Sequence, residues 1–444
     1  MSHSQEKRAQ REHAKAPWPA VLGLAISTLV TACAHPDAPR FKPSGYAITP
    51  DDFGRGPSAY ERTAGEKIAR TAGLGTAAWR DGAALRRPSD TGPDAGCGTG
   101  ARAARGFLLI HGFTDSPYVL RDLAERLRAL DRCAVIRTVA LPGHATVPGD
   151  LLDIRQGEWI AATGQAVDAM SAGAERVYLV GFSTGAALAL HDVASRGPRN
   201  IAGLVLLSPL VRVNPPGWAW LARPLSWVKT WDSGTSPGTL FASGAYPDED
   251  PVKYESTPWH AEAEIVALTD RLAQVTRAPL GVPVFMAVAS RDSTVDAPSA
   301  LRLFCRAAPP GRRRLVWYAL ASGAAEARSE LHGLGADDAC LAEVEVRDRA
   351  ATGAAANIRD FSHLSLPNRP GNPVYGEGGS YRNCVRYYFA DPARYAGCKT
   401  RPAEAENLGE NSDPDTALTI QRLTYNPDFG GMLARLGAFL VANP

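Results

Sequence analysis

The sequence has little excess charge, no apolar run long enough to cross a membrane as a helix, and no cysteine spacing typical of a metal site. Its 48 Lys and Arg nearly balance its 46 Asp and Glu, so the formal net charge of the 444 residues is +2. This balance gives no reason to expect nucleic acid or another acidic polymer as a partner. No CxxC pair and no Cys/His cluster has zinc-like spacing, so we expect no structural metal.

The N-terminus has the order of an export signal. Basic residues between positions 7 and 15 precede the apolar residues 20–30, and residues 30–33 read Val-Thr-Ala-Cys. So short an apolar stretch cannot span ~30 Å of hydrocarbon as a helix, which favours a signal peptide over a transmembrane anchor. Residues 30–33 resemble the lipobox of bacterial lipoproteins. The resemblance implies a signal peptide over residues 1–33 and lipidation of Cys33.

Lipidation would place the protein in the bacterial cell envelope. Acyl chains on Cys33 would hold it firmly to a membrane surface. Ala34 rather than Asp follows this cysteine, which implies the outer membrane, with the protein facing the periplasm. The alternative is a plain signal peptide in which Cys33 is incidental.

Six cysteines remain after Cys33, and an even number in an exported chain favours disulfides. Sequence alone permits many pairings. Joining neighbours along the chain would place each bond around one strand or loop. We therefore predict three local disulfides, Cys97–Cys133, Cys305–Cys340 and Cys384–Cys398.

Composition also divides the chain into segments. Residues 34–100 are rich in Gly, Pro, Arg and Asp, which predicts a tether and an irregular extension packed on the core. Residues 101–444 are predicted to form one domain with two additions. Five Trp among many Pro and Gly over residues 212–280 predict a cap above an active site, or else a self-packed excursion. Residues 320–430 are predicted to be a cystine-rich insertion.

From residue 106 onward, short apolar runs alternate with amphipathic stretches. Strands of a parallel sheet are apolar throughout when both of their faces are covered. Residues 119–130 carry leucines at helical spacing. The alternation predicts an α/β fold with a mostly parallel, doubly wound sheet. The expected strands are residues 107–110, 134–139, 177–180, 204–207, 284–288 and 315–318.

Residues 181–185 read Gly-Phe-Ser-Thr-Gly and lie between a predicted strand and a predicted helix. A G-x-S-x-G pattern in this context is typical of a nucleophile elbow, a sharp turn that presents the serine hydroxyl. Gly181 and Gly185 lack side chains, so the strand and the helix can approach closely. We therefore predict that Ser183 is a nucleophile held in a strained backbone conformation.

In folds with this elbow, the catalytic acid and then the base follow the nucleophile along the chain. Asp292 is the first carboxylate after the expected strand at 284–288, where it can reach an imidazole and hold its tautomer. His363 lies before a final predicted helix, and we predict it as the base. Asp296 and His332 are the alternatives for the two roles.

Two backbone N–H groups are expected to bind the oxyanion. One comes from the loop after the strand at 107–110, where we predict the N–H of Phe113. The other is the N–H of Thr184, directly after the nucleophile. His111 precedes the nucleophile in the chain, so we expect a structural role for it.

Four short segments together resemble one group of enzymes. They read LIHGFTDSP at 109–117, LPGH at 141–144, GFSTG at 181–185 and DSTV at 292–295. They are similar to the monoacylglycerol lipase, carboxylesterase and serine-aminopeptidase-like group of α/β hydrolases, over residues 105–300 and the Ser362-His363 pair. The resemblance implies the α/β-hydrolase fold and hydrolysis of carboxylic esters such as lysolipids or monoacylglycerols. Such a triad needs no cofactor.

The sequence departs from that group at three motifs. The group typically reads HGFTG, LPGHG and GFSMGG, whereas this chain has Asp115, Ala145 and Thr184-Gly185-Ala186. None of these changes removes a predicted catalytic residue, although they leave the acyl chain and the head group of the substrate open. The sequence also leaves the oligomeric state open. Two other functions remain: an aminopeptidase on the same residues, and a non-catalytic envelope lipoprotein that uses the fold for binding.

Overall fold

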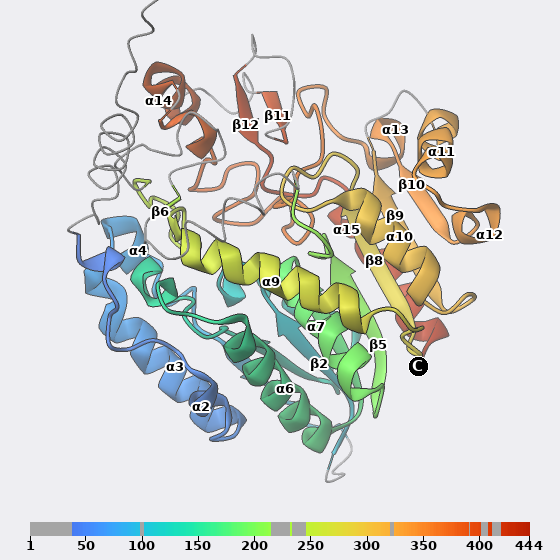
Figure 1. Cartoon of the computed structure of the whole chain (residues 1–444), viewed down its shortest axis with the longest axis horizontal. Helices are drawn as coiled ribbons and strands as arrows, with labels where there is room; N and C mark the ends of the chain where they lie inside the picture. The colour runs from blue at the N-terminus through green and yellow to red at the C-terminus, as the bar shows by residue number, and fades with distance from the viewer. Residues whose placement is uncertain are drawn as a thin grey trace, which may run out of the picture.

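The computed structural model describes residues 38–97, 102–214, 231–232, 246–319, 324–389, 391–400, 407–410 and 419–444. Within them, eight strands form one sheet in the order β1-β3-β2-β4-β5-β8-β9-β10 (Figure 1). β1 is antiparallel to β3, and the other neighbouring pairs are parallel. The strands are β1 (Ser89–Thr91), β2 (Ala103–Ile110), β3 (Val135–Val139), β4 (Ala174–Phe182), β5 (Ile201–Leu207), β8 (Val284–Ala289), β9 (Arg313–Tyr318) and β10 (Val344–Arg347).

The predicted α/β class is confirmed, and each predicted strand is present, as β2, β3, β4, β5, β8 or β9. Most residues of these strands are buried, because helices cover both faces of the sheet. The edge strands β1 and β10 are not among the strands predicted from the sequence. They are short and mostly exposed or half-buried, so they carry no apolar run.

Two helical layers enclose the sheet. Successive residues of β2 point to opposite layers, as the pleat requires. Leu108 and Ile110 pack in the core that contains α6, α7, α9 and α10, whereas Phe107 and Leu109 pack in the core that contains α5 and α15. Figure 1 shows α6, α7 and α9 crossing in front of the sheet. The helices are α5 (Arg121–Leu130), α6 (Gln156–Gly173), α7 (Thr184–Arg196), α9 (Trp259–Val275), α10 (Ala297–Ala307) and α15 (Phe429–Ala442).

The N-terminal extension is more regular than its composition predicts. In place of an irregular segment, the chain forms α2 (Pro50–Phe53), α3 (Pro57–Thr71) and α4 (Ala77–Asp81). Tyr60 and Ile68 of α3 are buried in the core beside the sheet, and the Tyr60 hydroxyl donates to the carbonyl of Ala140 at 2.9 Å. The buried stripe of α3 is narrow and lies among Gly and charged residues, which explains its weak periodicity.

The three predicted disulfides are confirmed. They are Cys97–Cys133, Cys305–Cys340 and Cys384–Cys398, with Cα–Cα distances of 5.4, 5.4 and 6.0 Å. The second joins α10 to α12 (Asp338–Leu341), and the third joins the turn before η7 (Val385–Tyr387) to α14 (Pro392–Thr400). Each disulfide joins two segments that are close along the chain, with sequence separations of 36, 35 and 14.

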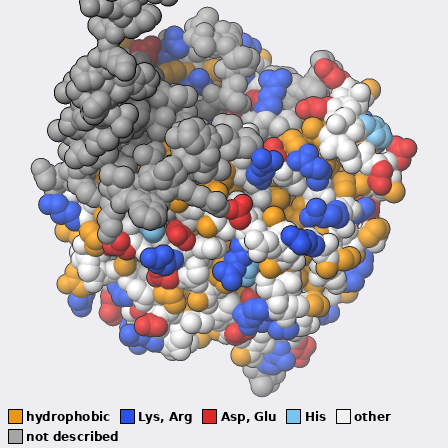
Figure 2. Space-filling model, viewed as in Figure 1, with side chains coloured by type: hydrophobic (Ala, Val, Ile, Leu, Met, Phe, Trp, Pro, Cys, Tyr) orange, Lys and Arg blue, Asp and Glu red, His pale blue; other side chains and the backbone are white. Residues whose placement is uncertain are grey.

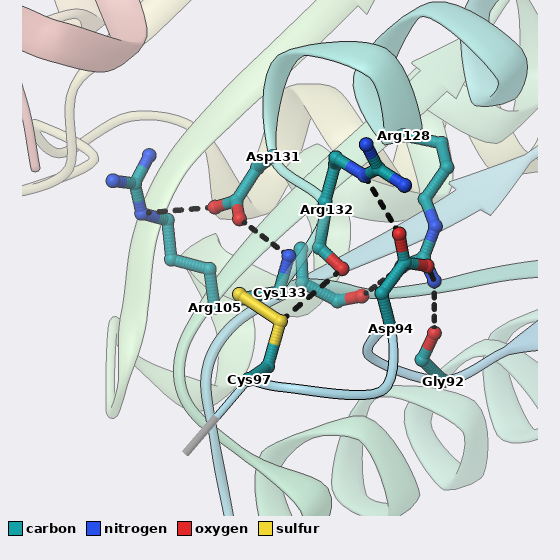
Figure 3. Close-up of a disulfide and its surroundings, with 9 residues drawn as sticks. Gly92, Asp94, Cys97, Arg105, Arg128, Asp131, Arg132 and Cys133 are labelled. Carbon is teal, nitrogen blue, oxygen red and sulfur yellow. Dashed lines mark hydrogen bonds and ion pairs between the residues drawn. A yellow bond between two sulfur atoms is a disulfide. The ribbon is translucent and has the colours of Figure 1, made fainter.

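The first disulfide lies within a small polar network (Figure 3). Cys97 follows β1, and Cys133 lies between α5 and β3. Beside the bond, Asp94 pairs with Arg128 at 2.5 Å and with Arg132 at 2.7 Å. These ion pairs and the disulfide together hold the segment after β1 against the end of α5.

The predicted insertion at residues 320–430 is partly integral to the domain, because it supplies β10 to the main sheet. It also forms a separate two-stranded parallel sheet of β11 and β12. A long segment without helix or strand, which contains His363, separates these parts. The remaining elements are α11 (Ala324–Gly333), α13 (Arg349–Thr352), β11 (Asn407–Gly409) and β12 (Ile420–Arg422).

The predicted cap at residues 212–280 falls partly outside the described residues, and three of its five Trp lie there. Of the described parts, β6 (Trp231–Asp232) pairs with β7 (Thr257–Pro258). Trp231 packs on Phe41 with ring centroids 4.8 Å apart. α9 packs along α6 and α7 over the sheet (Figure 1) and belongs to the domain core. A cap over the site stays a prediction for the residues before α9.

The predicted leader, residues 1–33 with Cys33, also lies outside the described residues. No helix in the described part of the chain is both long and apolar enough to cross a membrane. The face drawn in Figure 2 carries side chains of both charge signs, as the small net charge leads one to expect.

Candidate active site

Ser183 occupies a sharp turn between β4 and α7. Its backbone has φ 53° and ψ −115°, which is unusual for a residue with a side chain. Two glycines make this turn possible. A Cβ on Gly181 would lie 2.4 Å from the backbone of Ala186, and one on Gly185 would lie 1.9 Å from the carbonyl oxygen of Ile110. The strand–turn–helix geometry expected from the sequence is therefore present.

Asp292 and His363 meet in the interior, although 71 positions separate them in the chain. His363 Nδ1 lies 2.6 Å from Asp292 Oδ2, and the two side chains are 5% and 0% exposed. The other carboxylate oxygen of Asp292 accepts the N–H groups of Thr294 and Val295 at 2.8 and 2.9 Å. These bonds fix the carboxylate, and the carboxylate fixes the imidazole in the tautomer with hydrogen on Nδ1.

The turn that contains Ser183 adjoins this pair. The ring of Phe182, the residue before Ser183, packs on the ring of His363 with centroids 5.0 Å apart. Ser183 is 4% exposed. The predicted acid and base are thus hydrogen-bonded to each other, and the turn that contains Ser183 lies beside them at the carboxyl ends of β4 and β8, where α/β sheets usually place their sites.

The two alternative residues lie elsewhere. Asp296 precedes α10, where it bonds Ser299 and pairs with Arg302 at 3.4 Å. His332 is on α11, with a side chain 48% exposed, and its nearest acidic partner is Asp338 at 3.4 Å. Neither residue contacts His363 or Asp292 in the described structure.

The loop after β2 brings the predicted oxyanion donors to the same turn. A Cβ on Gly112 would lie 3.0 Å from Cβ of Ser183, so this loop passes directly beside Ser183. Among the described residues, no oxygen accepts the N–H of Phe113 or of Thr184. The N–H groups of Phe113 and Thr184 are therefore free to bind a substrate oxygen. Thr114, the residue after Phe113, has φ 66°.

Lys253 is a residue near this site that no sequence pattern singles out. Its Nζ donates to the carbonyl of Phe113 at 3.2 Å, to Thr114 Oγ1 at 2.6 Å and to Asp115 Oδ1 at 2.9 Å. Asp115 is buried, with a side chain 2% exposed. Lys253 therefore holds the loop that presents the Phe113 N–H, from a segment almost 140 positions away.

Two other histidines near the loop are structural. His111 accepts the N–H of Leu141 through Nε2 at 3.0 Å, and its Nδ1 lies 2.8 Å from the carbonyl of Gly112. Burial, with His144 beside it, holds the pKa of His111 well below its ordinary value. Burial also lowers the pKa of His144 to about 4. Both rings are neutral near pH 7, and the Nδ1 of His144 lies 2.9 Å from the carbonyl of Pro142.

Comparison with known proteins places this geometry in a family. The model of the alpha/beta hydrolase family matches residues 107–374, which is well over half of the chain. A thermostable monoacylglycerol lipase from Bacillus sp. strain H-257 is 26% identical over 226 residues, covering 49% of this chain and 77% of the relative.

Two solved structures are similar to part of this chain. A monoacylglycerol lipase from Paleococcus ferrophilus is 18% identical, with a TM-score of 0.42, and the match covers 56% of this chain and 97% of that one. A metagenome-derived lipolytic enzyme is 20% identical, with a TM-score of 0.41, and covers 52% and 86%. The mostly parallel sheet, its two helical layers and the family match agree: the chain belongs to the alpha/beta hydrolase family.

Proposed function

We propose that the protein is a serine hydrolase that cleaves carboxylic esters, with Ser183, His363 and Asp292 as its triad. The observation that carries the proposal is the buried His363–Asp292 hydrogen bond of 2.6 Å beside a serine with φ 53°. Holding a non-glycine residue in that region costs roughly 1–3 kcal/mol, and such strain gathers at functional sites.

The proposed reaction proceeds through an acyl-enzyme. His363 takes the proton of Ser183 Oγ as that oxygen attacks the ester carbonyl, and the N–H groups of Phe113 and Thr184 bind the oxyanion. His363 then protonates the leaving alcohol as the ester C–O bond breaks. Water, deprotonated by His363, attacks the acyl group, releases the carboxylic acid and restores the serine hydroxyl. Asp292 stabilises the imidazolium that forms in both steps.

The substrates that we propose are lysolipids, monoacylglycerols or similar acyl esters. The Bacillus relative, named a monoacylglycerol lipase, supports this class. A panel of p-nitrophenyl esters, a monoacylglycerol, a lysophospholipid and an aminoacyl anilide would test it. We expect hydrolysis of the acyl esters. Hydrolysis of the aminoacyl anilide alone would instead favour an aminopeptidase.

The direct test of the nucleophile is Ser183→Ala. We expect this change to abolish ester hydrolysis while leaving the melting temperature unchanged, because only one buried hydroxyl is lost. Ser195→Ala is a matched control, since Ser195 lies exposed on the helix that Ser183 precedes, and it should keep full activity. Undiminished hydrolysis by the Ser183 variant would rule out the proposed triad.

We also propose that the protein is anchored to the outer membrane through lipidated Cys33. The Val-Thr-Ala-Cys motif at residues 30–33 supports this proposal. The three disulfides support it as well, because disulfides persist in oxidising compartments. In a Gram-negative host, Cys33→Ser should abolish metabolic labelling with palmitate and leave an unprocessed or soluble precursor. Normal maturation of that variant at a nearby Ala would contradict the proposal.

A further inference from the structure

A buried ion pair lies behind the His363–Asp292 pair. Glu410 directly follows β11, and Arg422 is the last residue of β12. Arg422 Nε lies 2.8 Å from Glu410 Oε1, and the side chains are 12% and 1% exposed. Both residues lie beyond residues 107–374, the part of the chain that the family model matches.

Each member of the ion pair contacts one of the two catalytic loops. Glu410 Oε2 accepts the backbone N–H of His363 at 2.9 Å. Arg422 Nη2 donates to Thr294 Oγ1 at 2.8 Å, and the Thr294 N–H donates to Asp292 at 2.8 Å. One continuous chain of contacts thus runs from the base, through the ion pair, to the acid.

The backbone around the pair supports the same loop. His363 belongs to a segment without helix or strand, so its position depends on what it docks against. The Arg359 N–H donates to the carbonyl of Leu408 in β11 at 2.6 Å. After β12, the carbonyl of Thr424 accepts the side-chain amide of Asn368 at 3.0 Å. β11 and β12 therefore hold the base loop on both sides of His363.

Burying two charges is costly unless further hydrogen bonds use their remaining donors and acceptors. Here those bonds go to His363 and Thr294, which gives the pair a function besides stability. We propose that Glu410 and Arg422 are positioning residues that fix the His363 loop against the Asp292 loop, so that the imidazole is aligned with Ser183. This inference rests on the proposed function, because it assumes that these three residues react.

The test measures kcat and KM of Glu410→Gln and Arg422→Gln. Titration with a fluorophosphonate first gives the concentration of active sites in each preparation, and kcat is expressed per active site. Counting sites corrects for any unfolded fraction, so a purely structural defect would leave the kcat of each site unchanged. We expect kcat to fall roughly 10- to 100-fold, because small misplacements of catalytic groups have effects of this size. KM should change little, since misalignment of the imidazole removes stabilisation of the transition state and not of the bound substrate. Glu410→Gln keeps an acceptor for the His363 N–H, so its kcat should fall less than that of Glu410→Ala.

The matched control is Glu343→Gln, which breaks another buried ion pair. Glu343 pairs with Arg313 at 2.5 Å, with side chains 18% and 4% exposed. Arg313 begins β9, so this pair lies at the opposite end of the sheet from the site. The kcat of each site in the control should match that of the wild type.

A third variant keeps the test decisive if the Glu410 and Arg422 variants do not fold. Thr294→Val removes the Arg422 contact alone and should lower kcat several-fold. Wild-type kcat for each site in Thr294→Val, or in folded Glu410→Gln and Arg422→Gln, would overturn the inference. Failure of the wild type to react with the fluorophosphonate would instead overturn the proposed function, so the two failures are distinguishable.

Discussion

The carboxylate of Asp292 is completely buried, yet it has three polar partners: the imidazole of His363 and two backbone N–H groups. The N–H bonds occupy one oxygen and leave the other for the imidazole. This division of the two oxygens sets the direction in which the ring can point. A change at either residue should therefore affect catalysis far more than stability.

We expect Asp292→Asn and His363→Ala each to reduce kcat by several orders of magnitude. For Asp292→Asn the loss should be on the order of 10⁴, because an amide favours the wrong tautomer of the base. Steady-state hydrolysis of a p-nitrophenyl ester measures this directly. His332→Ala is the control and should be near wild type. The assignment of the base fails if the two histidine variants show the reverse pattern.

Lys253→Met should lower kcat roughly 10-fold or more, because the loop that presents the Phe113 N–H loses its three bonds to the ammonium group. Lys67→Met is a suitable control. Lys67 forms a similar partly buried ion pair with Asp52, at 2.6 Å, in the N-terminal extension. Equal kcat in both variants, measured for each folded molecule, would show that Lys253 does not position the loop.

Among the elements, the central strands were the most predictable. β2, β4, β5 and β8 are buried on both faces, so each is a continuous apolar run in the sequence. The elbow was predictable because one pentapeptide specifies it. The edge strands and α3 were not, since little of their surface is apolar and buried.

The side chains that we propose as the triad could be named from the sequence for a different reason: in folds with this elbow, the acid and the base follow the nucleophile in a fixed order along the chain. Their supports were not predictable. Lys253 with Asp115, and Glu410 with Arg422, are ion pairs formed by tertiary packing. Each joins charged residues that, in sequence, look like ordinary solvated charges. Only the packed structure shows that they are buried.

At the turn between β4 and α7, Gly185→Ala should destabilise the fold. The new methyl group would meet the carbonyl oxygen of Ile110, and backbone cannot move as cheaply as a side chain. We expect a loss of about 1–3 kcal/mol in the free energy of unfolding, measured by urea denaturation. Gly173→Ala, at the end of α6 with open space around it, should be close to neutral. Similar stability of the two variants would contradict the observed close approach.

The whole molecule contains buried acids whose titration links its stability to pH. Burial raises the pKa of Glu255 to about 8, and nearby Asp248 and Asp250 add to the effect, although a hydrogen bond from Tyr381 opposes it. The folded protein therefore keeps a proton on Glu255 at pH values where the unfolded chain has lost it. Because the folded state binds more protons, the free energy of unfolding must fall as pH rises from the unfolded pKa to about 8.

Between about pH 6.5 and 8 the buried acids Asp250 and Glu262, with pKa values raised to about 7, titrate as well, and histidines of the unfolded chain lose their remaining protons. The effect of Glu255 is therefore the difference between the wild type and Glu255→Gln, which we expect to be about 1–2 kcal/mol in the free energy of unfolding across this window. Glu255→Gln mimics the protonated form and should flatten the dependence. Glu330→Gln, at an exposed position on α11, should not. A slope in Glu255→Gln equal to that of the wild type would refute the assignment.

The measurement that tests the triad most directly is the mass of the protein after reaction with a fluorophosphonate, followed by peptide mapping. Our account predicts one adduct for each molecule, on the peptide that contains Ser183, and none in Ser183→Ala. The absence of an adduct on the folded wild type, or an adduct on another serine, would contradict it.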